Sequence, residues 1–123
     1  MKNTVVIVDD TPLYQEMLRK VVGGLGFQAV VCSDGDEAMA YVAEHRDEVH
    51  AVLLDLYMPQ IDGISALGHF HTHYPGLPIV MITGSDDTDD ERVAREMGAL
   101  GYIKKPFAPD ALANKLKEML KMQ

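Results

Sequence analysis

Apolar and polar residues follow two spacings along this chain. Five short runs are rich in β-branched and other apolar residues, and they cover residues 4–8, 27–32, 49–55, 78–83 and 101–104. Continuous apolar runs of this length are typical of strands that are buried on both faces, as in a parallel sheet. Between the runs, apolar residues recur every three or four positions, which is the spacing of one face of a helix. The pattern therefore predicts strands that alternate with helices.

Residues that start and stop helices flank the periodic stretches. In the first stretch, Thr11 offers a capping hydroxyl and Pro12 suits the first helical position. Gly23, Gly24 and Gly26 are expected to end that helix. The four later helices are predicted to end near His45, His73, Met97 and Lys121.

Five repeats of strand and helix favour an α/β fold. A (βα)5 pattern calls for a parallel sheet with helices on both faces, joined by right-handed crossovers. A chain of 123 residues is one domain by its length and is large enough to bury a core. No linker or low-complexity segment interrupts the pattern, so we predict a single domain over residues 1–123. The start at Met1 and the end after the fifth helix suit a single-domain protein, although a fragment of a longer chain would look the same.

Charge and cysteine content narrow the classes of partner and compartment. The net charge of -8 argues against a nucleic-acid contact surface, which favours clustered Lys and Arg. The single cysteine, Cys32, cannot form an internal disulfide, which fits a reducing compartment. No apolar stretch approaches the ~20 residues that a membrane span needs. We therefore expect a cytoplasmic domain that contacts neither nucleic acid nor membrane.

Reactive side chains follow four of the five predicted strands, namely Asp9 and Asp10, Asp55, Thr83, and Lys105. Ligands of open parallel α/β sheets bind beyond the carboxyl ends of the strands, so these groups should converge. Carboxylates that lie close together repel, and they favour a bound cation. Mg²⁺ prefers oxygen ligands, including carboxylates, phosphate and water. The cluster therefore predicts a magnesium site beside a nucleophilic carboxylate, which is the arrangement that phosphoryl transfer to an aspartate requires.

Each of these residues also has a plainer explanation when it is taken alone. An Asp-Asp pair after a strand is more often a helix cap or a turn than a metal site. A threonine at a strand end is usually a cap, and a Lys-Pro pair is usually a solvated turn. What favours a functional site is their joint occurrence at successive strand ends of one predicted fold.

The chain resembles, over its whole length, the receiver domain of two-component response regulators, a family that includes chemotaxis regulators. The matching motifs are Asp9-Asp10, Leu54 to Pro59 around Asp55, Asp62-Gly63, Ile82-Thr83-Gly84, and Gly101 to Phe107. The resemblance implies a flavodoxin-like, doubly wound sheet with strand order 2-1-3-4-5. It also implies that the second strand lies at the edge of the sheet, where no reactive residue is needed.

The resemblance implies a phosphoacceptor and a set of metal ligands. Asp55 would accept the phosphoryl group. Mg²⁺ would be held by Asp10 directly, by Asp9 largely through water, by Asp55, and by the backbone carbonyl of Tyr57. These roles are expectations for the residues at the matching positions of this chain.

The resemblance also implies a switch. Lys105, directly before Pro106, would pair with the phosphoryl group, so Lys104 should be the exposed lysine. Thr83 would hydrogen-bond a phosphoryl oxygen and draw its loop inward, because the new group adds negative charge at the site. The space left behind would let Tyr102 turn from exposed to buried. That movement would change the face made by the fourth helix, fifth strand and fifth helix.

The expected function is a phosphorylation-controlled signalling module. It would take a phosphoryl group from a sensor histidine kinase or a histidine phosphotransfer protein, and present the switched face to a downstream protein. It would be a switch and not an enzyme, catalysing only its own phosphorylation and slow dephosphorylation. Two alternatives stay open. A magnesium-dependent aspartyl-phosphate phosphatase usually has a second acid two residues after the nucleophile, where this chain has Tyr57. A receiver-like binding module that is never phosphorylated would not need the full set of reactive residues.

The remaining polar features have plainer interpretations. His69 and His73 lie four positions apart and could jointly hold a transition metal, but exposed residues at a helix end are the simpler explanation. The acidic run at 86–91 favours a helix start, where negative charge is stabilising. Tyr57 and Ser85 are expected to flank the route of an attacking water, and so to tune the lifetime of the phosphoryl group.

Overall fold

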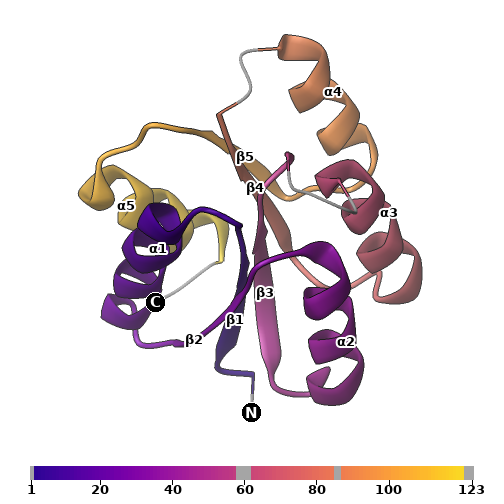
Figure 1. Cartoon of the computed structure of the whole chain (residues 1–123), viewed down its shortest axis with the longest axis horizontal. Helices are drawn as coiled ribbons and strands as arrows, with labels where there is room; N and C mark the ends of the chain where they lie inside the picture. The colour runs from indigo at the N-terminus through magenta and orange to yellow at the C-terminus, as the bar shows by residue number, and fades with distance from the viewer. Residues whose placement is uncertain (1, 58–61, 85–86, 121–123) are drawn as a thin grey trace.

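The computed structural model describes residues 2–57, 62–84 and 87–120 of the chain. Strands and helices alternate along it in one continuous series (Figure 1): β1 (Thr4–Val8), α1 (Pro12–Gly24), β2 (Gln28–Cys32), α2 (Gly35–His45), β3 (Val49–Leu54), α3 (Gly63–His73), β4 (Ile79–Thr83), α4 (Thr88–Glu96), β5 (Gly101–Lys104) and α5 (Pro109–Met119). All strand pairs are parallel, in the order β2-β1-β3-β4-β5. The predicted α/β fold and strand order are therefore confirmed.

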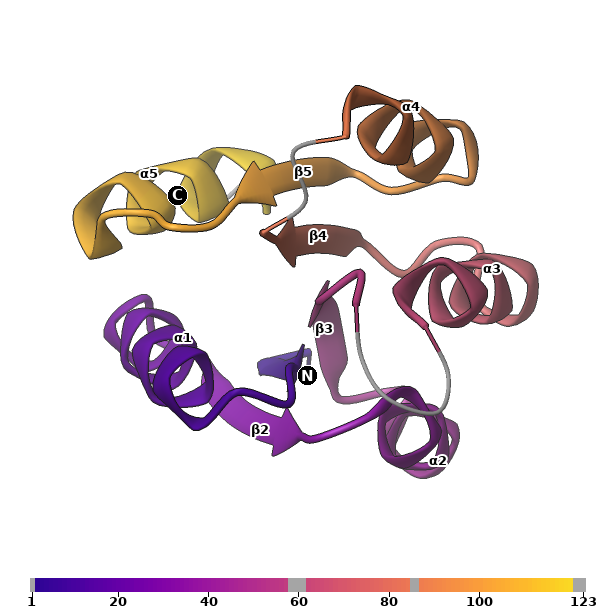
Figure 2. The ribbon, with the colours of Figure 1, turned by 45° about the horizontal axis from the view of Figure 1, so that its top comes forward.

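The helices cover both faces of the sheet. α1 and α5 lie on one side of the strands, and α2, α3 and α4 lie on the other (Figure 2). Neighbouring residues of a strand point to opposite faces. Accordingly Val5 and Ile7 belong to the core under α1 and α5, whereas Val6 and Val8 belong to the core under the other three helices. This two-sided burial explains why the strands are continuous apolar runs.

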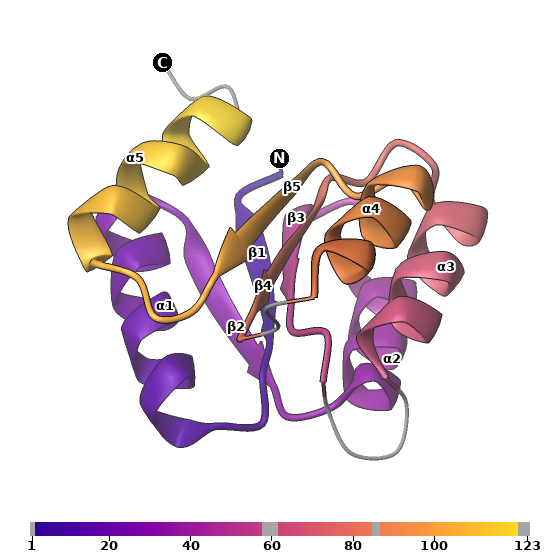
Figure 3. The ribbon, with the colours of Figure 1, turned by 90° about the horizontal axis from the view of Figure 1, so that it is seen from above.

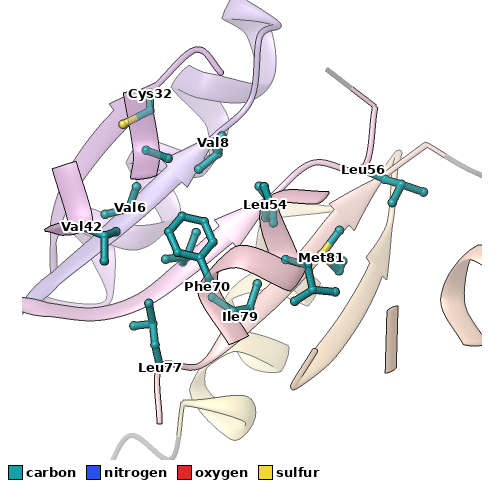
Figure 4. Packing of buried hydrophobic residues seen from close by; sticks show 14 of the residues in the cluster. Val6, Val8, Cys32, Val42, Leu54, Leu56, Phe70, Leu77, Ile79 and Met81 are labelled. Atoms are coloured by element: carbon teal, nitrogen blue, oxygen red, sulfur yellow. The ribbon is translucent and has the colours of Figure 1, made fainter. Parts of the chain in front are cut away.

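The second of these cores is centred on a helix residue. Phe70 of α3 is fully buried, and it lies among strand side chains that include Leu54, Ile79 and Met81 (Figure 4). Val42 of α2 belongs to the same cluster. Large apolar side chains therefore fix α3 against β3 and β4, and these strands position the residues that follow them.

The strand register aligns the ends that carry the reactive residues. Val8 of β1 is level with Leu54 of β3, so Asp9 and Asp55 leave the sheet side by side. The ladder extends one step further, because the Asp55 N–H donates to the Val8 carbonyl over 3.0 Å. The loops that follow β1, β3 and β5 leave the sheet at the same end (Figure 3). The reactive residues therefore lie at that end of the sheet.

Carboxylates cap the starts of three helices. The side chains of Asp34, Asp62 and Asp87 accept backbone N–H groups at the starts of α2, α3 and α4. The predicted hydroxyl cap at Thr11 is wrong, because its side chain makes no cap hydrogen bond. Instead, the Thr11 N–H donates to Asp9 Oδ1 over 2.8 Å. A site residue thus binds the amide that opens the first helix.

The predicted boundaries lie close to the observed ones. The three strands whose limits differ do so by one residue at one end. α4 begins at Thr88, so Asp89, Asp90 and Glu91 lie in its first turn and not before it. The expected end of the last helix at Lys121 lies outside the described residues, as do Asp86 and Ser85. Within the described part of the chain, every helix is too short or too polar to cross a membrane.

Candidate functional site

Three strand ends bring charged side chains together at one edge of the sheet. Asp9 follows β1, Asp55 follows β3, and Lys105 follows β5. The Lys105 ammonium nitrogen, Nζ, lies 2.7 Å from Asp9 Oδ2 and 3.3 Å from Asp55 Oδ2. In the strand order, β4 lies between β5 and β3, and β3 lies between β4 and β1, so the lysine side chain reaches past one strand to Asp55 and past two strands to Asp9. Residues that are far apart in the sequence therefore form one cluster.

This charged cluster is almost completely shielded from water. Asp9 is 1% exposed, Asp55 is 6% exposed, and the Lys105 side chain is 9% exposed. Burial raises the pKa of Asp55; the Lys105 charge opposes this rise, and the Asp9 charge adds to it. Two buried carboxylates share one ammonium group, so the cluster has an excess of negative charge. Such a site favours a bound cation or a retained proton.

Asp9 is held from several directions. Its Oδ1 atom accepts a hydrogen bond from the Thr11 N–H, and its Oδ2 atom accepts one from Lys105 Nζ. The Gln15 side chain donates to the Asp9 backbone carbonyl over 2.6 Å. Each carboxylate oxygen thus has a donor, which fixes the orientation of the side chain at the start of α1.

Asp10 completes an acidic cluster that could hold a metal ion. One carboxylate oxygen from each of Asp9, Asp10 and Asp55 lies within 4.8 Å of the others. Asp10 is exposed while the other two are buried, so the cluster opens to solvent on the Asp10 side. Hard oxygen donors with access to water suit a hard divalent cation that keeps part of its hydration shell. The Tyr57 N–H lies 3.3 Å from Asp55 Oδ1, so the Tyr57 backbone passes beside this cluster.

The residues predicted to form the switch lie on β4 and β5. Thr83 is fully buried, and its carbonyl accepts the Lys105 N–H over 2.8 Å. Tyr102 is 7% exposed and belongs to the core on the α3 side of the sheet. The structure therefore shows Tyr102 in the buried position that the sequence interpretation assigned to the switched state. Lys104 is exposed, as expected.

Gly63 explains the Asp62-Gly63 motif. The Gly63 N–H donates to the Leu56 carbonyl over 2.7 Å, which brings the start of α3 against the chain that follows β3. A Cβ atom at position 63 would collide with the backbone of Asp55 and Leu56. Only glycine permits this close approach, which holds the backbone beside Asp55 in place.

Three contacts of the site were not predicted from the sequence. The Tyr57 hydroxyl donates to Asp90 Oδ2 over 2.6 Å, which links the residue two positions after Asp55 to α4. The Tyr14 ring lies under the Lys105 ammonium, and Gln15 binds the Asp9 carbonyl. All three depend on how α1 and α4 pack on the sheet, and no local sequence motif indicates them.

Within the part of the chain that the structure describes, the histidine pair on α3 does not belong to a larger group of potential metal ligands. The His69 and His73 rings stack with their centroids 4.2 Å apart, and the His73 Nδ1 atom lies 2.9 Å from the His69 carbonyl. Burial and the neighbouring His73 lower the pKa of His69. Among the described residues, the acidic cluster around Asp55 is the one group of three or more potential metal ligands.

Comparison with known proteins identifies the family. A family model for the response regulator receiver domain matches residues 5–117. The chain belongs to this family. It is therefore a receiver domain of a two-component signalling system, and the comparisons favour neither of the two alternatives.

Individual relatives agree with this assignment. The DNA-binding response regulator MtrA of Mycolicibacterium smegmatis is 38% identical over 121 residues, which are 98% of this chain and 52% of that protein. The structure of a putative response regulator from Chloroflexus aurantiacus is 31% identical, with a TM-score of 0.88 and coverage of 98% of this chain and 99% of that one. The BeF3-activated N-terminal receiver domain of Klebsiella pneumoniae RstA is 31% identical, with a TM-score of 0.87 and coverage of 98% and 100%. The chain spans about half the length of the curated relatives that it matches.

Proposed function

We propose that this receiver accepts a phosphoryl group on Asp55 from a phosphohistidine of a sensor histidine kinase or a histidine phosphotransfer protein. The observation that carries the proposal is the buried cluster in which Lys105 Nζ lies 3.3 Å from Asp55 Oδ2, beside Asp9. An ammonium group at this place would neutralise charge on the transferred group, which is the main task in phosphoryl transfer.

The transfer is a displacement at phosphorus. A carboxylate oxygen of Asp55 attacks the phosphorus atom, and the bond from phosphorus to the donor imidazole nitrogen breaks. The electron pair of that bond stays on the nitrogen, which takes up a proton, and an aspartyl phosphate forms. Attack of water on the same phosphorus later releases inorganic phosphate and restores the carboxylate. The domain is therefore a switch that catalyses its own modification and its reversal, and not an enzyme with a metabolic substrate.

The acidic residues are proposed to hold Mg²⁺. Asp9, Asp10, Asp55 and the backbone carbonyl of Tyr57 would be its ligands. When bound, Mg²⁺ supplies positive charge that stabilises the phosphoryl oxygens in the transition state. Asp9 is already fixed by two donors, so its share would pass largely through water, whereas exposed Asp10 is free to approach the ion directly.

The output is proposed to pass through the α4–β5–α5 face. Thr83 would hydrogen-bond a phosphoryl oxygen, and Tyr102 would follow its movement. A pocket of about 360 Å³ lies on this face, and its lining includes Glu91 of α4, Tyr102 of β5 and Ala111 of α5. A downstream protein would dock there. A change in the position of Tyr102 would alter the lining of this pocket, so phosphorylation at Asp55 would change the shape of the surface that the downstream protein contacts.

The setting of the domain is also part of the proposal. Residues 1–123 are proposed to act as one receiver domain in the cytoplasm, without direct contact to nucleic acid or membrane. The net charge of -8 supports the absence of a phosphate-binding surface. The single cysteine supports a reducing compartment.

Uptake of a phosphoryl group from a small donor tests the proposal. With acetyl phosphate and Mg²⁺, intact-protein mass spectrometry should show one added phosphoryl group on the wild type, and chelation of Mg²⁺ should prevent it. Asp10→Ala should need far more Mg²⁺ for the same uptake. A wild type that gains no mass under these conditions would contradict the proposal, and an unchanged Mg²⁺ requirement in Asp10→Ala would place the ion elsewhere.

A further inference from the structure

Lys105 has a neighbour that belongs neither to the charged cluster nor to the proposed reaction. Its Nζ atom lies 4.0 Å from the centroid of the Tyr14 ring on α1. The ring of Phe107, two residues after Lys105, lies 5.7 Å from the Tyr14 ring at an angle of 53°. Tyr14 is half-buried in this position. The ammonium group is thus enclosed by two carboxylates and by the face of an aromatic ring.

An aromatic face is a favourable neighbour for an ammonium group. The negative face of the ring attracts the cation, and the attraction grows when water is excluded. The Lys105 side chain is 9% exposed, so little water competes with the ring. Lysine carries a compact charge on a flexible four-carbon stem, so the groups around the ammonium set its position. The ring limits the directions in which the stem can swing.

The position of the ammonium group matters because two carboxylates compete for it. Nζ is 2.7 Å from Asp9 Oδ2 and 3.3 Å from Asp55 Oδ2, so a shift of well under 1 Å changes which carboxylate lies nearer to the ammonium group. We propose that Tyr14 is a positioning residue that holds the Lys105 ammonium group at the Asp55 site and thereby supports phosphorylation of Asp55. The kinetic part of this inference rests on the proposed function, whereas the contact itself does not.

A plainer role for Tyr14 would be packing against Phe107 alone. The two roles differ in what they demand of position 14. Packing needs an apolar side chain of similar volume, which leucine approximates. Holding the cation needs an aromatic face, which phenylalanine keeps and leucine lacks. Tyr14→Phe and Tyr14→Leu therefore separate the two roles.

NMR of the lysine side chains tests the contact without any phosphorylation. Protons above an aromatic face are shielded, so the Lys105 ε-methylene protons should lie upfield of those of the adjacent, exposed Lys104. We expect this difference in the wild type and in Tyr14→Phe, and its loss in Tyr14→Leu. The proposal would be overturned if the ε-methylene protons of Lys105 in the wild type had the same chemical shift as those of Lys104. An upfield shift that persists in Tyr14→Leu would also overturn it.

The rate of phosphoryl uptake tests the consequence. Loss of a partly buried cation–π contact should slow uptake from acetyl phosphate about fivefold in Tyr14→Leu. Tyr14→Phe should stay near the wild-type rate. Phe107→Leu is the matched control, since it removes the neighbouring ring and leaves Tyr14 over the lysine, and it too should stay near the wild-type rate.

Two kinetic outcomes would overturn the positioning role. One is a wild-type rate in Tyr14→Leu, and the other is an equal slowing in Phe107→Leu. If Tyr14→Leu does not fold, Tyr14→Met takes its place in both experiments. If the wild type itself takes up no phosphoryl group, the proposed function fails, but the NMR comparison still decides whether Tyr14 holds Lys105.

Discussion

Aspartates at the helix starts and aspartates at the sheet edge meet different conditions in this molecule. Asp34 and Asp62 accept backbone N–H groups three residues further along, over 2.9 and 2.8 Å, and neither side chain is fully buried. Asp9 and Asp55 are buried, and both contact Lys105, which lies 96 and 50 residues away in the chain. A helix cap thus binds partners that are close in the sequence, whereas the contacts of Asp9 and Asp55 with Lys105 form only when the whole sheet has folded.

The difference also concerns free energy. A carboxylate cap stabilises its helix by about 1 kcal/mol, and it needs only the helix itself. Burial raises the pKa of Asp55, which means that the folded state disfavours its charged form. The charged form of Asp55 therefore does not stabilise the fold, and its position is explained by the proposed reaction at this carboxylate. Asp9 combines the two conditions, because it binds Lys105 and also the Thr11 amide at the start of α1.

The largest expected effect separates two adjacent lysines. Lys105→Met removes the ammonium group from the site and should slow phosphoryl uptake by about 100-fold, the scale of losing one preorganised charge-stabilising donor. Lys104→Met, one residue earlier and exposed, should leave the rate near that of the wild type. Time courses of intact mass with acetyl phosphate and Mg²⁺ measure both. Equal rates of phosphoryl uptake in the two variants would show that Lys105 takes no part in the reaction.

A smaller effect is expected at a helix cap. Asp34→Ala should lower the free energy of unfolding by about 1 kcal/mol, because the Glu37 N–H loses its acceptor. Asp34→Asn keeps an acceptor and should restore most of the loss. Urea denaturation measures the stabilities, and the uptake assay should show the wild-type rate for both variants. A slower uptake in Asp34→Ala would mean that the cap and the site are not independent.

The smallest effect is expected in the pH dependence of stability. Since the pKa of Asp55 is raised in the folded state, its contribution to stability is complete below its ordinary pKa and is lost as the pH rises through the raised value. Lys105 offsets part of the cost of burial, so the loss should be modest. Without Mg²⁺, Asp55→Asn should gain stability relative to the wild type as the pH rises over this range in urea titrations. A stability difference that does not change with pH would contradict the raised pKa.

Much of the fold was predictable because its causes are local. Apolar runs and helix spacing located all ten elements, and the resemblance supplied the strand order. The convergence of Asp9, Asp55 and Lys105 followed from a general property of parallel sheets, whose strand ends align. Here the sequence was informative because backbone geometry alone brings these residues together.

Other features depend on how side chains pack between elements. The predicted Thr11 cap was wrong because the Thr11 side chain makes no cap hydrogen bond, and the backbone N–H of Thr11 donates to the Asp9 carboxylate in the turn between β1 and α1. The contact of Tyr14 with Lys105 and the hydrogen bond of Tyr57 with Asp90 join residues 91 and 33 positions apart. Rotamers and helix placement decide such pairs, and neither is encoded in a short stretch of sequence.

The chemical identity of the acceptor residue tests the central claim most directly. Borohydride reduces an aspartyl phosphate to homoserine, which peptide mass spectrometry can locate in the chain. After treatment with acetyl phosphate and Mg²⁺, we expect homoserine at position 55 in the wild type and at no position in Asp55→Asn. Homoserine at Asp9 or Asp10, or modification that persists in Asp55→Asn, would contradict the assignment of Asp55 as the phosphoacceptor.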